Sequence, residues 1–329
     1  MIVRLLASIA IFGLTCAPSV AIDVERDDVK AFIESMAQQH QYDLEQLRDI
    51  LSQAESKQSI IEQISKPAER TLTWAEYRLI FLTRERVRAG ADFWQENRET
   101  LATISQSTGV PTEILVGIIG VETYFGRITG GHRVIDALTT LAFDYPPRQT
   151  FFRRELEEFL LLVREEGMEA TDAFGSYAGA MGRPQFMPSS YRAYAVDSTG
   201  DGRRDIWNNW ADVAGSVANY FVAHGWNTGE EVTSQATLSS RWRGPLPDNT
   251  LTPAETVRSL SDLGVMFSTE LPNNSESQLL TLEGDRGTEH WVGFHNFFVI
   301  TRYNRSVMYA LAVHQLGREI ALEIDHGAS

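Results

Sequence analysis

One carboxylate lies inside an otherwise apolar helical pattern, in the segment PTEILVGIIGVETYFGR that starts at Pro111. Glu122 follows Ile118 by four positions and Leu115 by seven, so it shares their apolar stripe rather than the solvent face. Pro111 suits a first helical position and Gly126 suits a helix end, which places Glu122 in the last turn, at a cleft wall. The apolar residues that recur at helical spacing are Ile114, Leu115, Ile118, Ile119 and Phe125.

A carboxylate in such a position has a distinctive chemistry. Burying a lone carboxylate disfavours its charged form, so its pKa rises. A carboxylic acid that is still protonated near neutral pH can act as a general acid. A structural glutamate bonded to an arginine or a backbone amide has the same spacing, because structural networks also perturb carboxylates. Periodicity alone leaves both interpretations of Glu122 open.

A second stretch has the spacing of a metal-binding loop. Residues 197–208 read DSTGDGRRDIWN, with oxygen ligands at the first, third and fifth positions of an EF-hand-like loop and Gly202 at the sixth, where the chain turns sharply. Position twelve is Asn208 instead of a bidentate glutamate, so a bound Ca²⁺ or Na⁺ is expected to be weakly held; a metal-free Asp/Gly turn is the alternative. The predicted ligands are Asp197, Thr199, Asp201, Asp205 and Asp212 through their side chains and Arg203 through its backbone carbonyl.

Composition and motif searches argue against several other functions. The 329 residues carry a net charge of −15, so no nucleic-acid partner is expected, because phosphate binding requires clustered Lys and Arg. The sequence has no G-x-S-x-G elbow, no H-E-x-x-H pair and no P-loop or dinucleotide fingerprint. Serine hydrolysis, metal-dependent hydrolysis and nucleotide-dependent chemistry therefore lack their usual signatures.

The first residues have the pattern of an export signal. Arg4 precedes an apolar run over residues 5–14, and Ser19-Val20-Ala21 is a small-x-small cleavage site, so residues 1–21 are predicted to be a signal peptide. Cys16 is the single cysteine, and the residues before it, Gly13-Leu14-Thr15, make a poor lipobox. We therefore expect an exported periplasmic protein rather than a lipoprotein anchored to the outer membrane.

Hydrophobic periodicity around these stretches predicts a mainly helical chain. The segment GSYAGAMGRPQFMPSS, residues 175–190, is rich in glycine and small residues, which let a backbone approach a ligand closely; an irregular connector is the alternative. Residues 126–148 read as a glycine-rich loop closed by two prolines. Helices are predicted within residues 27–64, 73–82, 91–108, 151–165, 211–224 and 305–320, and β-type runs at residues 232–238, 279–282 and 291–300.

Five motifs in this order resemble the lytic murein transglycosylase B family: GIIGVETYFGR, FDYPPR, GSYAGAMGRPQFMPSSYRAYAVDSTGDGRRDIW, GSVANYFVAHGW and HNFFVITRYNRSVMYALAVHQLG. The resemblance runs nearly from Trp74 to Leu316. It implies a mainly α fold, with a lysozyme-like helical core, a flanking helical domain, an EF-hand-like loop and a small β-rich insertion. The expected divisions are the signal peptide at 1–21, an N-terminal helical domain at 22–110, the catalytic core at 111–228 containing the loop 197–208, the β-rich domain at 229–300, and a C-terminal helix at 301–329 that packs back on the core.

The resemblance also implies a reaction that needs no cofactor. Glu122 would be the sole acid/base at the MurNAc–GlcNAc bond of peptidoglycan, protonating the glycosidic oxygen and then drawing a proton from the C6 hydroxyl of the same muramyl residue. Ring closure gives a 1,6-anhydromuramyl end, and no second carboxylate at the spacing of an ordinary glycosidase is needed. The family's sugar-binding positions correspond here to Tyr77, Ser176, Gln185, Tyr220, Tyr303 and Tyr309, whose uncharged polar groups and aromatic faces suit a glycan.

Two alternatives stay open on the sequence. A hydrolytic muramidase would use water and a positioned base, for which Asp136 and Asp144 are the nearest candidates in sequence, although both also fit a loop-structuring role. A non-catalytic peptidoglycan-binding module would have a degenerate site, against which the presence of Glu122, Ser176 and Gln185 argues. The expected partners are peptidoglycan glycan strands, with other cell-wall enzymes as further candidates, and a monomer is expected.

Overall fold

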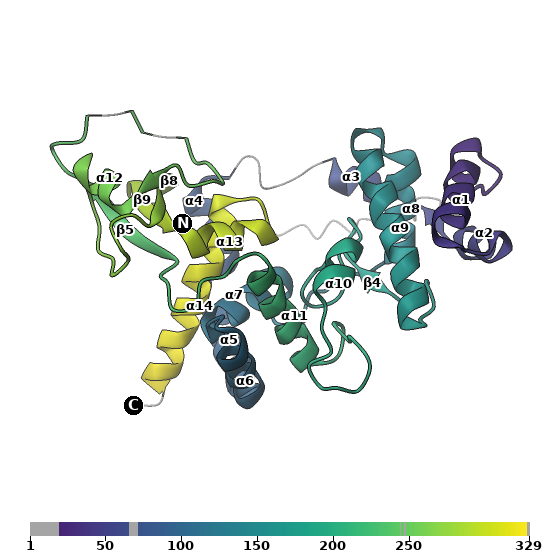
Figure 1. The fold of residues 1–329 in the computed structure, drawn as a ribbon, viewed down its shortest axis with the longest axis horizontal. Coiled ribbons are helices and arrows are strands. Elements are labelled where there is room, and N and C mark those ends of the chain that lie inside the picture. The colour runs from purple at the N-terminus through teal and green to yellow at the C-terminus, as the bar shows by residue number, and fades with distance from the viewer. Residues whose placement is uncertain (1–19, 66–71, 244, 247, 328–329) are drawn as a thin grey trace, which may run out of the picture.

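The computed structural model describes residues 20–65, 72–243, 245–246 and 248–327, and its fold is mainly α with small sheets (Figure 1). The helices are α1 (Asp27–His40), α2 (Leu44–Ser52), α3 (Gln58–Ile64), α4 (Trp74–Phe81), α5 (Arg84–Glu96), α6 (Arg98–Thr108), α7 (Thr112–Thr123), α8 (Val134–Asp144), the 3₁₀ turn η2 (Pro146–Arg148), α9 (Gln149–Glu166), α10 (Pro188–Tyr194), α11 (Trp210–Ala223), α12 (Val257–Asp262), α13 (His295–Tyr303) and α14 (Val307–Gly327). The strands are β1 (Val20–Ala21), β2 (Glu55–Ser56), β3 (His132–Arg133), β4 (Phe174–Gly175), β5 (Thr233–Leu238), β6 (Glu255–Thr256), β7 (Val265–Met266), β8 (Glu276–Gly284) and β9 (Gly287–Phe294).

Helix α7, which carries Glu122, lies at the centre of the molecule and packs along α14 (Figure 1). Its residues from Ile114 to Val121 are all buried. The two helices approach so closely that a Cβ added at Gly117 would lie 2.4 Å from the carbonyl oxygen of Val313. Only a glycine permits this approach, so the contact fixes α7 against the helix that faces it.

The end of α7 differs from the sequence prediction. The helix ends at Thr123, three residues before Gly126, because Tyr124 and Phe125 adopt left-handed backbone conformations with φ of 51° and 57°. Glu122 nevertheless lies in the last turn, as predicted.

Among the described residues, no single helix is long and apolar enough to cross a membrane; α6 and α7 pass that test only as a pair, across a bend of 116°.

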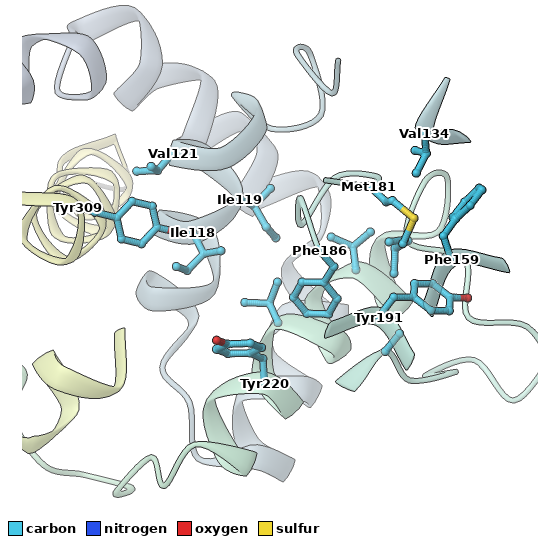
Figure 2. Close-up of a cluster of buried hydrophobic side chains, with 14 of the residues drawn as sticks. Ile118, Ile119, Val121, Val134, Phe159, Met181, Phe186, Tyr191, Tyr220 and Tyr309 are labelled. Atoms are coloured by element: carbon cyan, nitrogen blue, oxygen red, sulfur yellow. The ribbon is translucent and has the colours of Figure 1, made fainter. Parts of the chain in front are cut away.

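The glycine-rich segment is held against α7 by a shared buried cluster. Figure 2 shows Ile118 and Ile119 of α7 in this cluster with Met181 and Phe186 of the glycine-rich segment and Tyr220 of α11. The rings of Phe186 and Tyr220 lie 5.8 Å apart. This core positions the backbone of residues 175–190 beside the end of α7.

Helix α8 lies where the sequence predicted a loop, and that prediction was wrong. All residues from Val134 to Phe143 are buried, including Asp136, so the helix has no polar face to give an amphipathic pattern. Its flanking glycines and prolines also resemble those of a loop.

The first three helices pack at one end of the molecule, against α8 and α9 rather than against α4 to α6 (Figure 1). The ring of Phe32 in α1, for example, meets Phe143 of α8 edge-on at 5.8 Å. Helices α4 and α5 instead contact α14. The predicted N-terminal helical domain, residues 22–110, therefore meets the rest of the chain through two separate packings.

A small sheet lies at the opposite end of the molecule from α1 and α2 (Figure 1). Its strand order is β6-β8-β9-β5-β7, and every paired neighbour is antiparallel. The predicted β-type run over residues 291–300 is correct only in its first part, because β9 ends at Phe294 and α13 begins at His295. The predicted end of the β-rich domain at residue 300 therefore falls inside a helix. The sheet has a core of its own, made of Ala236, Val257, Leu260, Val265, Leu279, Val292 and Phe294.

Candidate active site

Glu122 and Tyr309 form the centre of the candidate site. Glu122 is half-buried, and its Oε1 accepts a hydrogen bond of 2.5 Å from the Oη of Tyr309, in the first turn of α14. Burial, and after it the negative charge of Glu122, raises the pKa of Tyr309 well above its ordinary value. The tyrosine hydroxyl therefore stays protonated at neutral pH and remains a hydrogen-bond donor to the carboxylate. Glu122 is less buried than its apolar stripe predicted.

Two more of the predicted tyrosines lie near this pair. Tyr303 and Tyr77 both contribute to the raised pKa of Tyr309, after burial and Glu122, which places both close to it. Burial, followed by the charge of Glu122, also raises the pKa of Tyr303. Tyr77 lies in α4 and is 1% exposed. The structure thus brings Tyr303 and Tyr309 close to Glu122, with Tyr77 near Tyr309.

Tyr220 lies behind this group. Its ring is 4.8 Å from the ring of Tyr303 and stacks on His224 at 4.0 Å. The Oη of Tyr220 donates to the carbonyl oxygen of Arg302 at 2.7 Å, and that of Tyr303 donates to Pro184 at 2.6 Å. Both hydroxyls therefore already donate to backbone carbonyl oxygens, and toward a ligand they can only accept a hydrogen bond.

Ser176 and Gln185 hold the glycine-rich segment in shape. The Oγ of Ser176 accepts hydrogen bonds from the backbone N–H groups of Ala178 and Ala180. Gln185 has a left-handed backbone with φ of 53°, which is costly for a residue with a Cβ. Its Nε2 donates to the carbonyl oxygens of Gly182 at 2.8 Å and Thr129 at 3.1 Å. The second bond ties this segment to the chain that leaves α7.

The two chains also touch through their backbones. A Cβ added at Gly130 would lie 2.1 Å from the carbonyl oxygen of Gly175, so only glycine fits there. This contact and the Gln185 side chain fix the distance between the end of α7 and the glycine-rich segment. Among the described residues, the Oε1 of Gln185 accepts no hydrogen bond, which leaves it available to a ligand.

The two aspartates considered as catalytic bases are occupied elsewhere. Asp136 is fully buried, and its carboxylate accepts hydrogen bonds from Arg133 at 2.8 Å, from Lys57 at 2.7 Å and from the backbone N–H of Glu55 at 2.9 Å. These bonds join α8 to the strand β2. A carboxylate that is neutralised by two cations and closed off from solvent has no access to a substrate.

Asp144 has a similar structural role at the other end of α8. Its Oδ1 accepts from Arg26 at 2.8 Å and its Oδ2 from the hydroxyl of Ser56 at 2.6 Å. Arg26 also pairs with Asp28, so the carboxylate belongs to a network that anchors the N-terminal helices. Both aspartates are therefore structural residues, although they lie in helix α8 rather than in the loop that the sequence predicted.

The loop 197–208 is organised by hydrogen bonds from its backbone to its carboxylates. Asp197 accepts the backbone N–H groups of Gly200 at 2.6 Å and Gly202 at 2.7 Å, and the latter bond is the main reason why its pKa is lowered. Both carboxylate oxygens of Asp212 accept backbone N–H groups, from Ser198 and Asp205. Burial raises the pKa of Asp212 in spite of these bonds.

This arrangement does not assemble the predicted metal ligands. The part of the chain that the structure describes contains no group of three or more His, Cys, Asp or Glu side chains placed to hold a metal ion. Asp197, Asp205 and Asp212 each use carboxylate oxygens on backbone N–H groups instead. The predicted metal site therefore stays a prediction.

A stack of arginine and aromatic side chains beside Glu122 was missed by the sequence analysis. We call it the rim stack; it consists of Phe81, Arg86, Tyr124 and Arg127. Arg86 lies over the rings of Phe81 and Tyr124, with its Cζ 5.2 and 4.5 Å from their centroids, and Arg127 lies over Tyr124 at 5.0 Å. In the sequence Arg86 is one of three arginines at alternate positions, a pattern that indicates only a solvated helix.

The predicted signal peptide lies almost wholly outside the described residues, which begin at Val20. Cys16 and the weak lipobox therefore lie outside them too. Of the predicted segment, only Val20 and Ala21 are described; they form β1, which pairs with β2 in the register Val20↔Ser56 and Ala21↔Glu55.

Comparisons with known proteins agree with this fold. Residues 25–318 match the transglycosylase SLT domain family. The chain is 42% identical over 304 residues to the membrane-bound lytic murein transglycosylase B of Escherichia coli (strain K12), covering 90% of this chain and 83% of that protein.

Two solved structures are also similar along nearly the whole chain. The catenated lytic transglycosylase SltB1 from Pseudomonas aeruginosa is 48% identical with a TM-score of 0.87, covering 91% of this chain and 98% of that one. The Escherichia coli lytic transglycosylase Slt35 in complex with calcium is 41% identical with a TM-score of 0.84, covering 93% and 96%. The chain therefore belongs to the transglycosylase SLT domain family.

Proposed function

We propose that the protein is a lytic transglycosylase that cleaves the β-1,4 bond between MurNAc and GlcNAc in peptidoglycan and leaves a 1,6-anhydromuramyl end. One observation carries this proposal. Glu122 is half-buried and is held by the hydroxyl of Tyr309, whereas the carboxylates considered as a second catalytic group, Asp136 and Asp144, are bound to cations. A single acid/base favours an intramolecular reaction over hydrolysis, which ordinarily uses two carboxylates.

This reaction needs only one acid/base group, Glu122. The protonated Glu122 gives its proton to the glycosidic oxygen, the bond from C1 of the muramyl residue to that oxygen breaks, and GlcNAc leaves with a free hydroxyl. The carboxylate of Glu122 then takes the proton of the muramyl C6 hydroxyl as O6 bonds to C1. Glu122 ends protonated, and no water is consumed. The hydrogen bond from Tyr309 fixes the orientation of the carboxylate in both steps.

We assign substrate binding to Tyr77, Ser176, Gln185, Tyr220, Tyr303 and Tyr309. Their surroundings suggest different contributions. The free Oε1 of Gln185 can accept a hydrogen bond from a sugar hydroxyl or an N-acetyl N–H, while the buried tyrosines contribute by shaping the site around Glu122. Ser176 acts through the shape of the glycine-rich segment, because its Oγ already accepts two backbone bonds.

The cellular setting and the bound ion are also proposals. A cell-wall substrate requires export, which agrees with the predicted signal peptide, and we propose a monomer in the periplasm with glycan strands as its partners. We propose weak Ca²⁺ binding by the loop 197–208, with no part in the chemistry, supported by the spacing of Asp197, Thr199 and Asp201 and by the calcium complex of a relative.

The test is to digest purified peptidoglycan with the protein and to identify the released muropeptides by mass spectrometry. The proposal predicts anhydromuropeptides from the native protein and none from the Glu122→Gln variant. Muropeptides with reducing ends would indicate a hydrolytic muramidase. Absence of any product from the native protein, together with retained binding to peptidoglycan, would indicate a non-catalytic module.

A further inference from the structure

The rim stack begins at the candidate active site and leads away from it. The ring of Tyr77, which lies near Tyr309, is 5.2 Å from the ring of Phe81 in the next turn of α4. Arg86 of α5 lies over both Phe81 and Tyr124, which is two residues after Glu122, and Arg127 also lies over Tyr124. Three segments of the chain thus build one continuous set of planar groups beside the catalytic carboxylate.

The stack is tied to the end of α7 rather than loosely placed. The Nη1 of Arg86 donates to the carbonyl oxygen of Gly120 at 3.1 Å, in the last turn of that helix, where a cation is favoured by the helix dipole. Tyr124 has a left-handed backbone, an unfavourable conformation for an aromatic residue, and in this conformation its ring lies against both arginines. These contacts place the stack at the same helix end as Glu122.

The two arginines of the rim stack lack an acidic partner among the described residues, unlike several other arginines of this protein. The chain carries a net charge of −15, and arginines such as Arg26, Arg133 and Arg192 pair with carboxylates. Arg86 and Arg127 form no ion pair with any residue that the structure describes. Burial lowers the pKa of Arg86, so its charge is partly desolvated without a counter-ion. A partly desolvated guanidinium favours a carboxylate ligand.

Peptidoglycan has a part that fits this charge. The sugar hydroxyl and N-acetyl groups are neutral, whereas the short peptide carried by each muramyl residue has free carboxylates. That peptide is attached to the muramyl ring, next to the bond on which Glu122 is proposed to act. We propose that the rim stack binds a carboxylate of this peptide stem through Arg86 and Arg127, an inference that rests on the proposed function. The stack would then select strands that still carry their peptides.

The test compares two substrates: purified peptidoglycan with its peptide stems, and glycan strands from which an amidase has removed them. Arg127→Gln is the first variant, because Arg127 is exposed and its loss is not expected to disturb folding. Arg86→Gln is the second variant, and Arg84→Gln is the matched control. Arg84 is exposed on the same helix two positions before Arg86, so it lies on the opposite face of that helix.

On strands with stems, each rim variant is expected to lower kcat/KM about tenfold, the value of one lost charge-assisted contact, and rising salt is expected to lower the native rate. On strands without stems, native protein, rim variants and control are expected to agree within about twofold. Equal losses on both substrates, or no loss on either, would overturn the inference.

A binding measurement separates this inference from the proposed function. If the native protein releases no product, the proposed function fails, and the inference is then judged with the Glu122→Gln protein by calorimetry. A soluble GlcNAc-MurNAc-peptide is expected to bind about tenfold more tightly than the same disaccharide without its peptide. The Arg127→Gln change in that background is expected to remove the difference. Equal affinity for the two ligands would contradict the inference.

Discussion

The hydrogen bond from Tyr309 to Glu122 gives the sharpest quantitative prediction of this account. The substitution Tyr309→Phe keeps the buried ring and removes only the Oη that lies 2.5 Å from the carboxylate. The packing of α14 against α7 is therefore retained, and the change acts on the orientation of Glu122.

The expected loss of turnover follows from the type of hydrogen bond that is removed. A hydrogen bond to a charged group contributes about 1.5–3 kcal/mol, which corresponds to roughly a 10- to 100-fold change in rate. Since Tyr309 stays protonated through the pH range of the assay, its hydroxyl donates to Glu122 in every state in which the carboxylate is ionised. We therefore expect kcat to fall by about 10- to 100-fold while KM changes by less than about threefold.

The assay is the initial rate of anhydromuropeptide release at several substrate concentrations. Tyr191→Phe is the control, because Tyr191 is likewise buried and its hydroxyl likewise donates a hydrogen bond, but to the backbone carbonyl oxygen of Arg204 and away from Glu122. Both variants are expected to lose similar thermal stability, and only Tyr309→Phe is expected to lose turnover. An unchanged kcat in Tyr309→Phe would refute the view that this bond orients the acid.

Three further predictions concern stability and the ion. Asp136→Asn leaves Lys57 and Arg133 without their buried partner, so urea unfolding is expected to show a free energy of unfolding that is lower by about 3 kcal/mol. Kinetic measurements are expected to show an unchanged kcat. Lost activity with normal stability would instead identify Asp136 as a base. Burial lowers the pKa of His314 in the folded protein to about 4. As the pH falls, the histidine is therefore protonated first in the unfolded chain, and the free energy of unfolding decreases between about pH 6.5 and pH 4, by up to about 3 kcal/mol. Urea unfolding at pH 7 and pH 4.5 should show this loss in the native protein and a smaller one in His314→Gln, and equal losses would show that His314 is not its source. For a loop with a Kd of about 1 mM, 10 mM Ca²⁺ should add about 1.4 kcal/mol of stability and raise the Tm, whereas an unchanged Tm would rule out calcium binding there.

Local patterns in the sequence were sufficient for several elements. The helix around Glu122 and the final helix have strong apolar periodicity, and both are present as α7 and α14. The helix predicted at residues 73–82 is present as α4, which begins with a capping box made by Thr73 and Glu76. Such signals depend on residues a few positions apart, and a sequence displays them directly.

Features set by distant residues were not predictable in the same way. Helix α8 is buried on all sides, so it shows no amphipathic pattern, and α13 follows β9 directly inside one apolar run. The pairing of Asp136 with Lys57 joins residues 79 positions apart. The rim stack likewise depends on α4, α5 and the chain after α7 meeting in space.

The candidate site was predicted through the resemblance more than through periodicity. Periodicity singled out Glu122 but left a structural role open, and nothing local connects it to Tyr309, which lies 187 positions later. The roles of the hydroxyls of Tyr220 and Tyr303 were also out of reach, because they donate to carbonyl oxygens of other segments.

The central claim is that Glu122 closes the muramyl ring internally instead of activating water. It is tested most directly by digesting peptidoglycan in water enriched in heavy oxygen and analysing the new muramyl ends by mass spectrometry. The account predicts anhydromuramyl ends that carry no heavy oxygen, and no new ends from Glu122→Gln. Reducing muramyl ends labelled at C1 would contradict it, because they require water as the nucleophile.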